Sequence, residues 1–411
     1  MSNKGFKPNN KNFKIIQNDA FSVILFTLLT SSSALFYFGL SGLLVFFGTA
    51  VETGIAGTIS RSIQMAVAFF SLGLATLVNF SAMDEENIVS RVFWSRLILF
   101  PFLIITFIFI QFWLNIPHFW LLSFFVMGSS LLQTQIYLDA SKNKVKTSFA
   151  YALSFYGLFF LLFVFSQLNV FMIPLIGLVT GIFGTIFFLL LHREMIVKIT
   201  FLTKYHIKQA FFFYMDGITF NLLLLDQLIV VSFLGQEVGG VYEWNSVVSR
   251  SILLLSAALY TLAMRKFLAI RPLPEKALKY LFYVLGLSFL FTFAVVSVVT
   301  VAYYLLFNLG FVSIIFRDYM LLLPLMIASI FWNLNGVLSA FLFSKNNFYL
   351  SPLTNTIVVI VLIVTNITLI PIYGVLVSSI TFASVASIVF IARLIFCLKY
   401  IIKKKENHKP F

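Results

Sequence analysis

The chain has 411 residues, of which 61% are hydrophobic and only 10% are charged, and its mean hydropathy is +1.02. A soluble protein of this length carries about 25% charged residues, so this composition excludes a water-soluble fold. The net charge of +14 comes from basic residues in short segments between apolar runs, which favours contact with lipid headgroups over nucleic acid. The sequence therefore predicts an all-α, multi-pass membrane protein.

Apolar runs of about 20 residues, the length that crosses a bilayer, follow one another along the chain. Twelve spans are predicted, at 20–48, 55–81, 92–114, 118–138, 147–168, 170–191, 210–234, 240–264, 279–308, 320–343, 350–370 and 372–398. The first run is too long for the core of a signal peptide and lacks a clear cleavage site, so it is interpreted as a span.

Basic residues cluster in alternate loops between these spans. They precede the first span and follow each even-numbered one, and together these positions hold 25 of the 28 Lys and Arg residues. By the positive-inside rule this pattern places both termini in the cytoplasm. The three exceptions are Arg61, Arg250 and Arg317.

Three short strings recur in the same order in the two halves of the chain. Arg61 and Arg250 lie in copies of Ser-Arg-Ser-Ile, Lys142 and Lys345 in copies of Ser-Lys-Asn, and Pro174 and Pro371 in similar Ile-Pro-x-x-Gly turns, at offsets of 189, 203 and 197 residues. We therefore predict two six-helix lobes, 1–198 and 199–411, related as parallel repeats. The basic, amphipathic segment 192–209 between them is expected to lie along the cytoplasmic surface. Two such bundles facing each other match the plan of alternating-access transporters.

Two stretches of the second half resemble a known family. They are "NLLLLDQLIVVSFLGQEVGGVYEWNSVVSRS" (221–251), with an Asp-bearing helix that ends in "FLG", and 355–400, with its "LIPIYG" turn and basic tail. Both resemble the O-antigen and exopolysaccharide unit flippases, whose superfamily also holds lipid II flippases and multidrug antiporters. The resemblance implies movement of an undecaprenyl-pyrophosphate-linked oligosaccharide from the cytoplasmic to the periplasmic leaflet, with cationic residues meeting the pyrophosphate. It also implies a place in a bacterial inner membrane, and it suggests a polysaccharide polymerase and a chain-length regulator as partners, besides the lipid bilayer.

The two arginines inside predicted spans are the main candidate site residues. An arginine at the centre of a spanning helix costs on the order of 2.5–3.5 kcal/mol, so it should face a wet cavity or a partner. The planar guanidinium matches phosphate oxygens bidentately, and Arg61 and Arg250 are therefore candidates for binding the pyrophosphate. Two interpretations stay open for Arg250, because Asp226 on the preceding helix could neutralise it. No acid lies in the span before Arg61, so its replacement by alanine is expected to leave membrane insertion intact.

Other polar residues give weaker signals. Glu243 shares a helix face with Arg250 and, with Asp226, is a candidate for proton coupling or structural pairing, although its place near the outer surface favours a solvated rim group. Trp332, Asn333 and Asn335 are candidate sugar contacts, and helix–helix hydrogen bonds are the alternative for the two amides. The histidines show no metal spacing and there is no nucleotide-binding loop, so no metal, cofactor or enzymatic activity is expected.

Two alternatives to the flippase remain. A multidrug or cation antiporter of the same superfamily would need an acidic cavity, whereas this chain sets two arginines against one deep aspartate. A membrane glycan polymerase or ligase would need catalytic residues on a large outer loop, and the predicted outer loops are short.

Overall fold

The computed structural model describes residues 29, 32–71, 74, 77–78, 87–114, 116–142, 145–197, 199–204, 206–207, 210–211, 225–252, 267, 274–344 and 350–406. The start of the first predicted span, the end of the second, the first part of the seventh and the last part of the eighth lie outside these residues. The secondary structure of the described part is helical throughout, and eight of its segments are long and apolar enough to cross a membrane. The predicted all-α, multi-pass fold class is confirmed.

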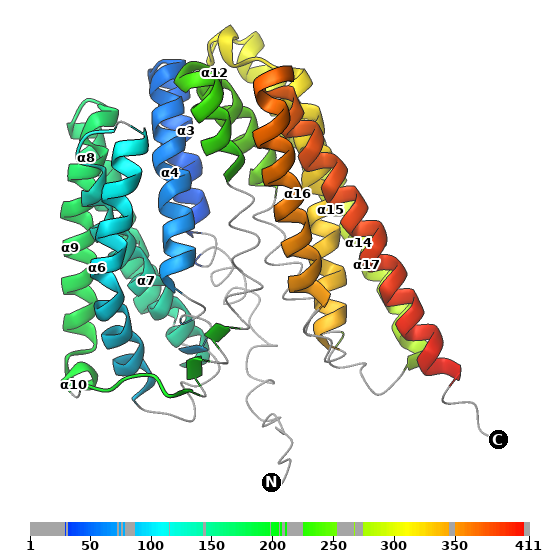
Figure 1. The fold of residues 1–411 in the computed structure, drawn as a ribbon, viewed down its shortest axis with the longest axis horizontal. Coiled ribbons are helices and arrows are strands. Elements are labelled where there is room, and N and C mark those ends of the chain that lie inside the picture. Colours follow the sequence, from blue (N-terminus) through cyan, green and yellow to red (C-terminus); the bar gives the residue numbers. More distant parts are fainter. Residues whose placement is uncertain are drawn as a thin grey trace.

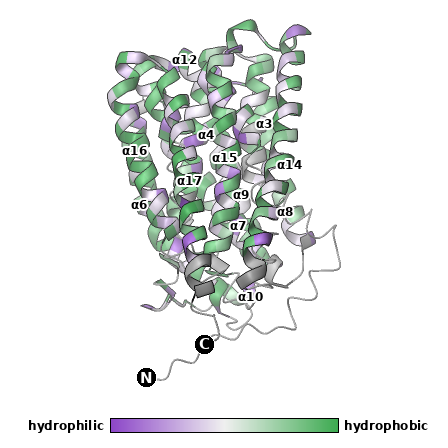
Figure 2. Cartoon of the chain, turned by 90° about the vertical axis from the view of Figure 1, so that its right-hand side faces the viewer, coloured by the Kyte–Doolittle hydropathy of each residue, from purple (hydrophilic) through white to green (hydrophobic). Residues whose placement is uncertain are grey.

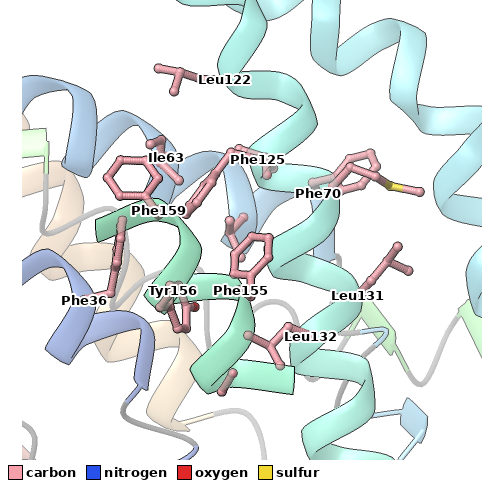
Figure 3. Packing of buried hydrophobic residues seen from close by; sticks show 14 of the residues in the cluster. Phe36, Ile63, Phe70, Leu122, Phe125, Leu131, Leu132, Phe155, Tyr156 and Phe159 are labelled. Carbon is pink, nitrogen blue, oxygen red and sulfur yellow. The ribbon is translucent and has the colours of Figure 1, made fainter. Parts of the chain in front are cut away.

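One bundle is formed by the helices of the first half (Figure 1). They are α3 (Ser32–Phe47), α4 (Ala50–Ser71), α6 (Ile88–Leu114), α7 (Leu122–Lys142), α8 (Val145–Phe165), α9 (Ile173–Leu191) and the short α10 (Arg193–Ile196), with 3-10 turns at Phe119–Leu121 and Val170–Met172. Aromatic rings fill the core between α3, α7 and α8 (Figure 3). The ring of Phe36 lies 4.8 Å from that of Tyr156 and 4.8 Å from that of Phe159, which fixes α3 against α8.

The helices of the second half pack into another bundle. They are α12 (Leu225–Ser251), α14 (Pro274–Asn308), α15 (Tyr319–Ser344), α16 (Leu350–Tyr373) and α17 (Leu376–Glu406), with a 3-10 turn at Ile314–Phe316. Arg393, which the loop pattern assigned to the basic tail, is instead buried on α17. It donates to the hydroxyls of Ser339 on α15 and Thr354 on α16, at 2.7 and 3.0 Å, and so ties three helices together.

The surface of both bundles is hydrophobic. Most residues of α14, α16 and α17 are hydrophobic (Figure 2). Large apolar side chains such as Phe112, Leu290 and Ile388 are well exposed. Because water would oppose this exposure and lipid would not, the chain is a multi-pass membrane protein.

The start of the second span differs from its sequence-based boundary. The second span was expected to begin at residue 55, but α4 begins at Ala50. Thr49 and Glu52 form a capping box there: the Thr49 backbone N–H donates to the Glu52 carboxylate at 2.8 Å, and the Glu52 N–H donates to the Thr49 hydroxyl at 3.2 Å. In α12 the helix reverses at Gly235, directly after the predicted end of the seventh span at residue 234. Its φ of 84° and ψ of 175° suit only glycine, so α12 is a hairpin of two arms.

The segment between the halves packs on the first bundle. The Trp94 indole on α6 donates to the carbonyl of Ile196 at 3.1 Å, and both Leu202 and Ala210 pack against the first hydrophobic core. Part of the predicted linker therefore covers one end of the first bundle. The boundary between lobes at residues 198 and 199 stays a prediction.

Candidate functional site

The most extensive helix contact in the described part of the chain joins the two bundles, between α4 and α12 (Figure 1). Two glycines allow it. A Cβ atom on Gly54 would lie 1.9 Å from the carbonyl oxygen of Gln236, and one on Gly240 would lie 1.8 Å from the carbonyl oxygen of Ala50. Any other residue at either position would push the backbones apart. The contact lies beside the Gly235 turn, at what we call the Gly235 end of the molecule.

A buried ion pair crosses this contact. The Arg61 Nε and Nη2 atoms on α4 donate to Glu243 Oε2 and Oε1 on α12, at 3.2 and 3.1 Å. Ser41 on α3 donates to Glu243 Oε1 at 3.1 Å. Glu243 is 0% exposed and Arg61 only 4% exposed. A Cβ on Gly57 would lie 2.6 Å from Glu243 Cγ, so this glycine makes room for the glutamate between the bundles.

A second buried ion pair lies within the second bundle. Arg250 Nη2 donates to Asp226 Oδ2, which joins the two arms of α12, and the pairing considered from the sequence is confirmed. The Tyr242 hydroxyl donates to Asp226 Oδ2 at 2.6 Å, and the Gln227 backbone N–H donates to Asp226 Oδ1 at 2.7 Å. The Arg250 guanidinium also lies over the ring of Phe382, 5.4 Å from its centroid.

A small cavity, with room for about one water molecule, adjoins this second pair. Its walls include Asp226, Asn366, Ser378 and Phe382. The Asn366 amide donates to the Ser378 hydroxyl at 3.3 Å, and that hydroxyl lies 3.1 Å from the Tyr242 hydroxyl. Hydrogen bonds thus run from α16 through α17 to Asp226. Tyr242, Asn366 and Ser378 were missed from the sequence, because single polar residues in apolar runs do not reveal which helices they join.

The surroundings of Arg61 and Glu243 correct two expectations. Glu243 was expected to be a solvated rim group, and this was wrong because α3 and α4 cover its face of α12. The sequence showed no acid in the span before Arg61, and the partner of Arg61, Glu243, comes from the other bundle, so Arg61→Ala would leave a buried acid without its arginine, contrary to expectation. Sequence offers no direct signal for a contact between two halves.

The three candidate sugar contacts lie on α15 inside the second bundle. Asn333 donates to the Ile252 carbonyl and the Thr292 hydroxyl, both at 3.4 Å, and Asn335 donates to the Ala386 carbonyl at 3.1 Å. Trp332 packs beside Phe382 with ring centroids 6.3 Å apart. Both amides thus make the helix–helix bonds that were the alternative interpretation. A sugar contact by these residues stays a prediction, since all three are buried in this conformation.

The described residues offer no cluster of three or more His, Cys, Asp or Glu side chains that could hold a metal ion. What the site provides instead is two arginine–carboxylate pairs, one between the bundles and one inside the second. Such pairs can bind an anion or a cation only by exchanging partners.

No protein-family model matches the chain, and no curated protein matches its sequence. Solved structures do match over nearly the whole chain. An inward-facing multidrug resistance MATE family transporter of the MOP superfamily aligns with a TM-score of 0.64 and 13% identity, over 93% of this chain and 96% of the other. An outward-facing one aligns with a TM-score of 0.61 and 13% identity, over 97% and 100% of the two chains. A eukaryotic MATE transporter aligns with a TM-score of 0.58 and 14% identity, over 97% of this chain and 99% of the other. At such identities the likeness is one of fold: this chain has the fold of MATE transporters.

Proposed function

We propose that this chain is an alternating-access transporter of the MOP superfamily, and that it carries undecaprenyl-pyrophosphate-linked oligosaccharides across the inner membrane. The observation that carries the transporter proposal is the α4–α12 contact: in the described part of the chain, two bundles meet at one end through close backbone contact and one ion pair. The solved structures that share the fold are described as inward-facing and outward-facing transporters, which supports a rocking movement about such a contact.

Charge supports an anionic substrate. At the described candidate site the carboxylates of Asp226 and Glu243 each bind an arginine already, so a cationic drug would have to remove a guanidinium before it could bind there. A pyrophosphate could instead take the place of a carboxylate on Arg61 or Arg250, because both anions accept the same pair of guanidinium N–H bonds. The resemblance of residues 221–251 and 355–400 to polysaccharide unit flippases points to the same substrate class.

The test is complementation of a bacterium whose own polysaccharide flippase has been deleted. Surface polysaccharide and the cytoplasmic pool of lipid-linked repeat units are measured together with the amount of this protein in the membrane. Restored surface polysaccharide would support the proposal. Absence of export by a well-expressed protein, in a host that makes its native repeat unit, would overturn it.

A second candidate is a multidrug or cation antiporter. The observation that favours it is that two of the solved structures sharing the fold are described as multidrug resistance transporters. Resistance of a drug-sensitive strain to cationic dyes separates the two functions. An antiporter would confer resistance without restoring polysaccharide, and a flippase would do the reverse. Partners in polysaccharide assembly, a polymerase and a chain-length regulator, belong only to the first proposal.

A further inference from the structure

We propose that Arg61, Glu243 and Ser41 form a latch that locks the two bundles together at the Gly235 end, and that release of Glu243 from Arg61 opens this end. The inference rests on the proposed alternating-access function and adds to it the residues that hold one gate shut. The predicted topology places the Gly235 end on the periplasmic side.

Burial along the two helices marks where the closed contact ends. Every residue from 53 to 63 of α4 is buried, and partial exposure begins at Gln64. On α12 every residue from 242 to 249 is buried, and Arg250 is partly exposed. The ion pair therefore lies near the deep end of the closed contact, which continues to Met65 of α4 packed against Leu228 of α12. Arg61 Nη1 also donates to Gln64 Oε1 at 3.3 Å. A carrier that opened at the Gly235 end would have to break this pair.

The latch has two parts: the close contact of the α4 and α12 backbones at their glycines, and the ion pair of Arg61 with Glu243, which can be released. Gly54 and Gly240 meet the opposite backbone directly, so these positions offer no side chains that interlock. The Glu243 carboxylate on α12 accepts hydrogen bonds from the first bundle, from Arg61 on α4 and Ser41 on α3. Three hydroxyls on α4 and α12, those of Ser60, Ser62 and Ser246, are buried without a hydrogen-bond partner among the described residues. Ser60 and Ser62 flank Arg61 in the sequence, and Ser246 follows Glu243 by three residues, so all three lie on the two segments that the latch joins.

The test measures access to a cysteine buried on α12. Ser246→Cys is introduced in a Cys397→Ala background, and right-side-out spheroplasts are treated with a membrane-impermeant maleimide. Glu243→Gln keeps the side-chain shape but removes the charge that holds Arg61. We expect the labelling rate to rise about tenfold, the population change that corresponds to 1.4 kcal/mol. Glu237→Cys, at an exposed position beside the Gly235 turn, is the labelling control for each variant.

Two further variants make the result specific to this pair. Asp226→Asn breaks the other buried ion pair, which lies inside one bundle, and should leave labelling of the cysteine introduced at Ser246 at the background rate. The exchanged pair Arg61→Glu with Glu243→Arg restores the bond in reverse and should return labelling towards background. Background labelling in Glu243→Gln, with normal labelling of the control, would overturn the latch. Equal increases in Glu243→Gln and Asp226→Asn would overturn it as well, since they would indicate general loosening.

Labelling requires no substrate, so this result is separable from the proposed function. Increased labelling in Glu243→Gln, in a protein that cannot export polysaccharide, would contradict the proposed flippase function and support the latch. Export by the wild-type chain, with labelling unchanged in Glu243→Gln, would keep the transporter and contradict the gate.

Discussion

Two copies of the same four residues, Ser-Arg-Ser-Ile, place an arginine in each bundle, and the two arginines have different partners. Arg250 binds Asp226 within α12, where Tyr242 and the Gln227 backbone also bind the carboxylate. Arg61 binds Glu243 across the contact between the bundles. The first pair stabilises a hairpin inside one bundle, whereas the second joins the two bundles, which would have to separate in the proposed transport cycle.

The difference follows from what each repeat lacks. At the offset of 189 residues that relates the arginines, the counterpart of Asp226 is Tyr37 and the counterpart of Glu243 is Gly54. The first copy therefore has no acid for its own arginine, and it has a glycine where the second has a glutamate. The missing acid is supplied by the other bundle, and the glycines of α4 leave the space for it. The two predicted repeats therefore contribute unequally to the contact between the bundles.

The largest loss of stability is expected when either buried ion pair is broken by removal of its arginine. Arg61→Ala and Arg250→Ala each leave a carboxylate buried without its arginine, a loss that typically costs about 3–5 kcal/mol, so both proteins should become less abundant in the membrane. For Arg61 this corrects the expectation drawn from sequence, which foresaw no stranded acid. The measurement is membrane abundance together with thermal unfolding in detergent.

Membrane abundance should be restored only when the second substitution removes the carboxylate that belongs to the missing arginine. Glu243→Gln should restore part of the abundance lost in Arg61→Ala, and Asp226→Asn should do so for Arg250→Ala. If Asp226→Asn rescued Arg61→Ala equally well, the two pairs would be one coupled network and would not differ in the way described above.

A smaller effect is expected from Gly240→Ala. The added methyl group would meet the Ala50 carbonyl oxygen at 1.8 Å, and neither backbone can yield without separating α4 from α12. Overpacking of this kind typically costs about 1–3 kcal/mol. The unfolding temperature in detergent should fall, and cysteines at the contact should become accessible. Gly336→Ala on α15 is the matched control, since a Cβ there meets nothing within 4 Å, and it should be neutral or slightly stabilising.

The smallest effect concerns the start of α4. Thr49→Ala removes the cap of the helix that carries Gly54 and Arg61, and should lower stability by about 1 kcal/mol. Thr106→Ala, which loses only a bond to the Phe102 carbonyl within its own helix, serves as the control. If both substitutions had the same effect on unfolding temperature, the capping box would not contribute to holding α4 in place.

Composition and periodic charge were enough to predict the all-α membrane fold, because lipid imposes long apolar runs on any spanning helix. The Asp226–Arg250 pair could also be predicted from the sequence, since a short turn makes the two arms of α12 neighbours. The capping box of Thr49 and Glu52 is visible in the sequence but was not used, so the predicted span began after the true start of α4 at Ala50. The Arg61–Glu243 pair was out of reach: 182 residues separate its members, and hydropathy does not say which faces of two bundles meet.

Gly54 and Gly240 each face a carbonyl group of the opposite helix, and this affects how strongly α4 and α12 associate in lipid. Because acyl chains are as apolar as side chains, no hydrophobic force draws spanning helices together, and close packing has to do so. Glycine Cα–H groups facing carbonyl oxygens add weak hydrogen bonds, worth about 0.5–1 kcal/mol each. At this contact the glycine contacts and the ion pair accompany an apolar cluster that joins Val45 and Ala50 to Trp244 and Val248. In the proposed transport cycle the glycine contacts and the ion pair are short in range and fix one register, so the two helices can meet again in the same position after each separation.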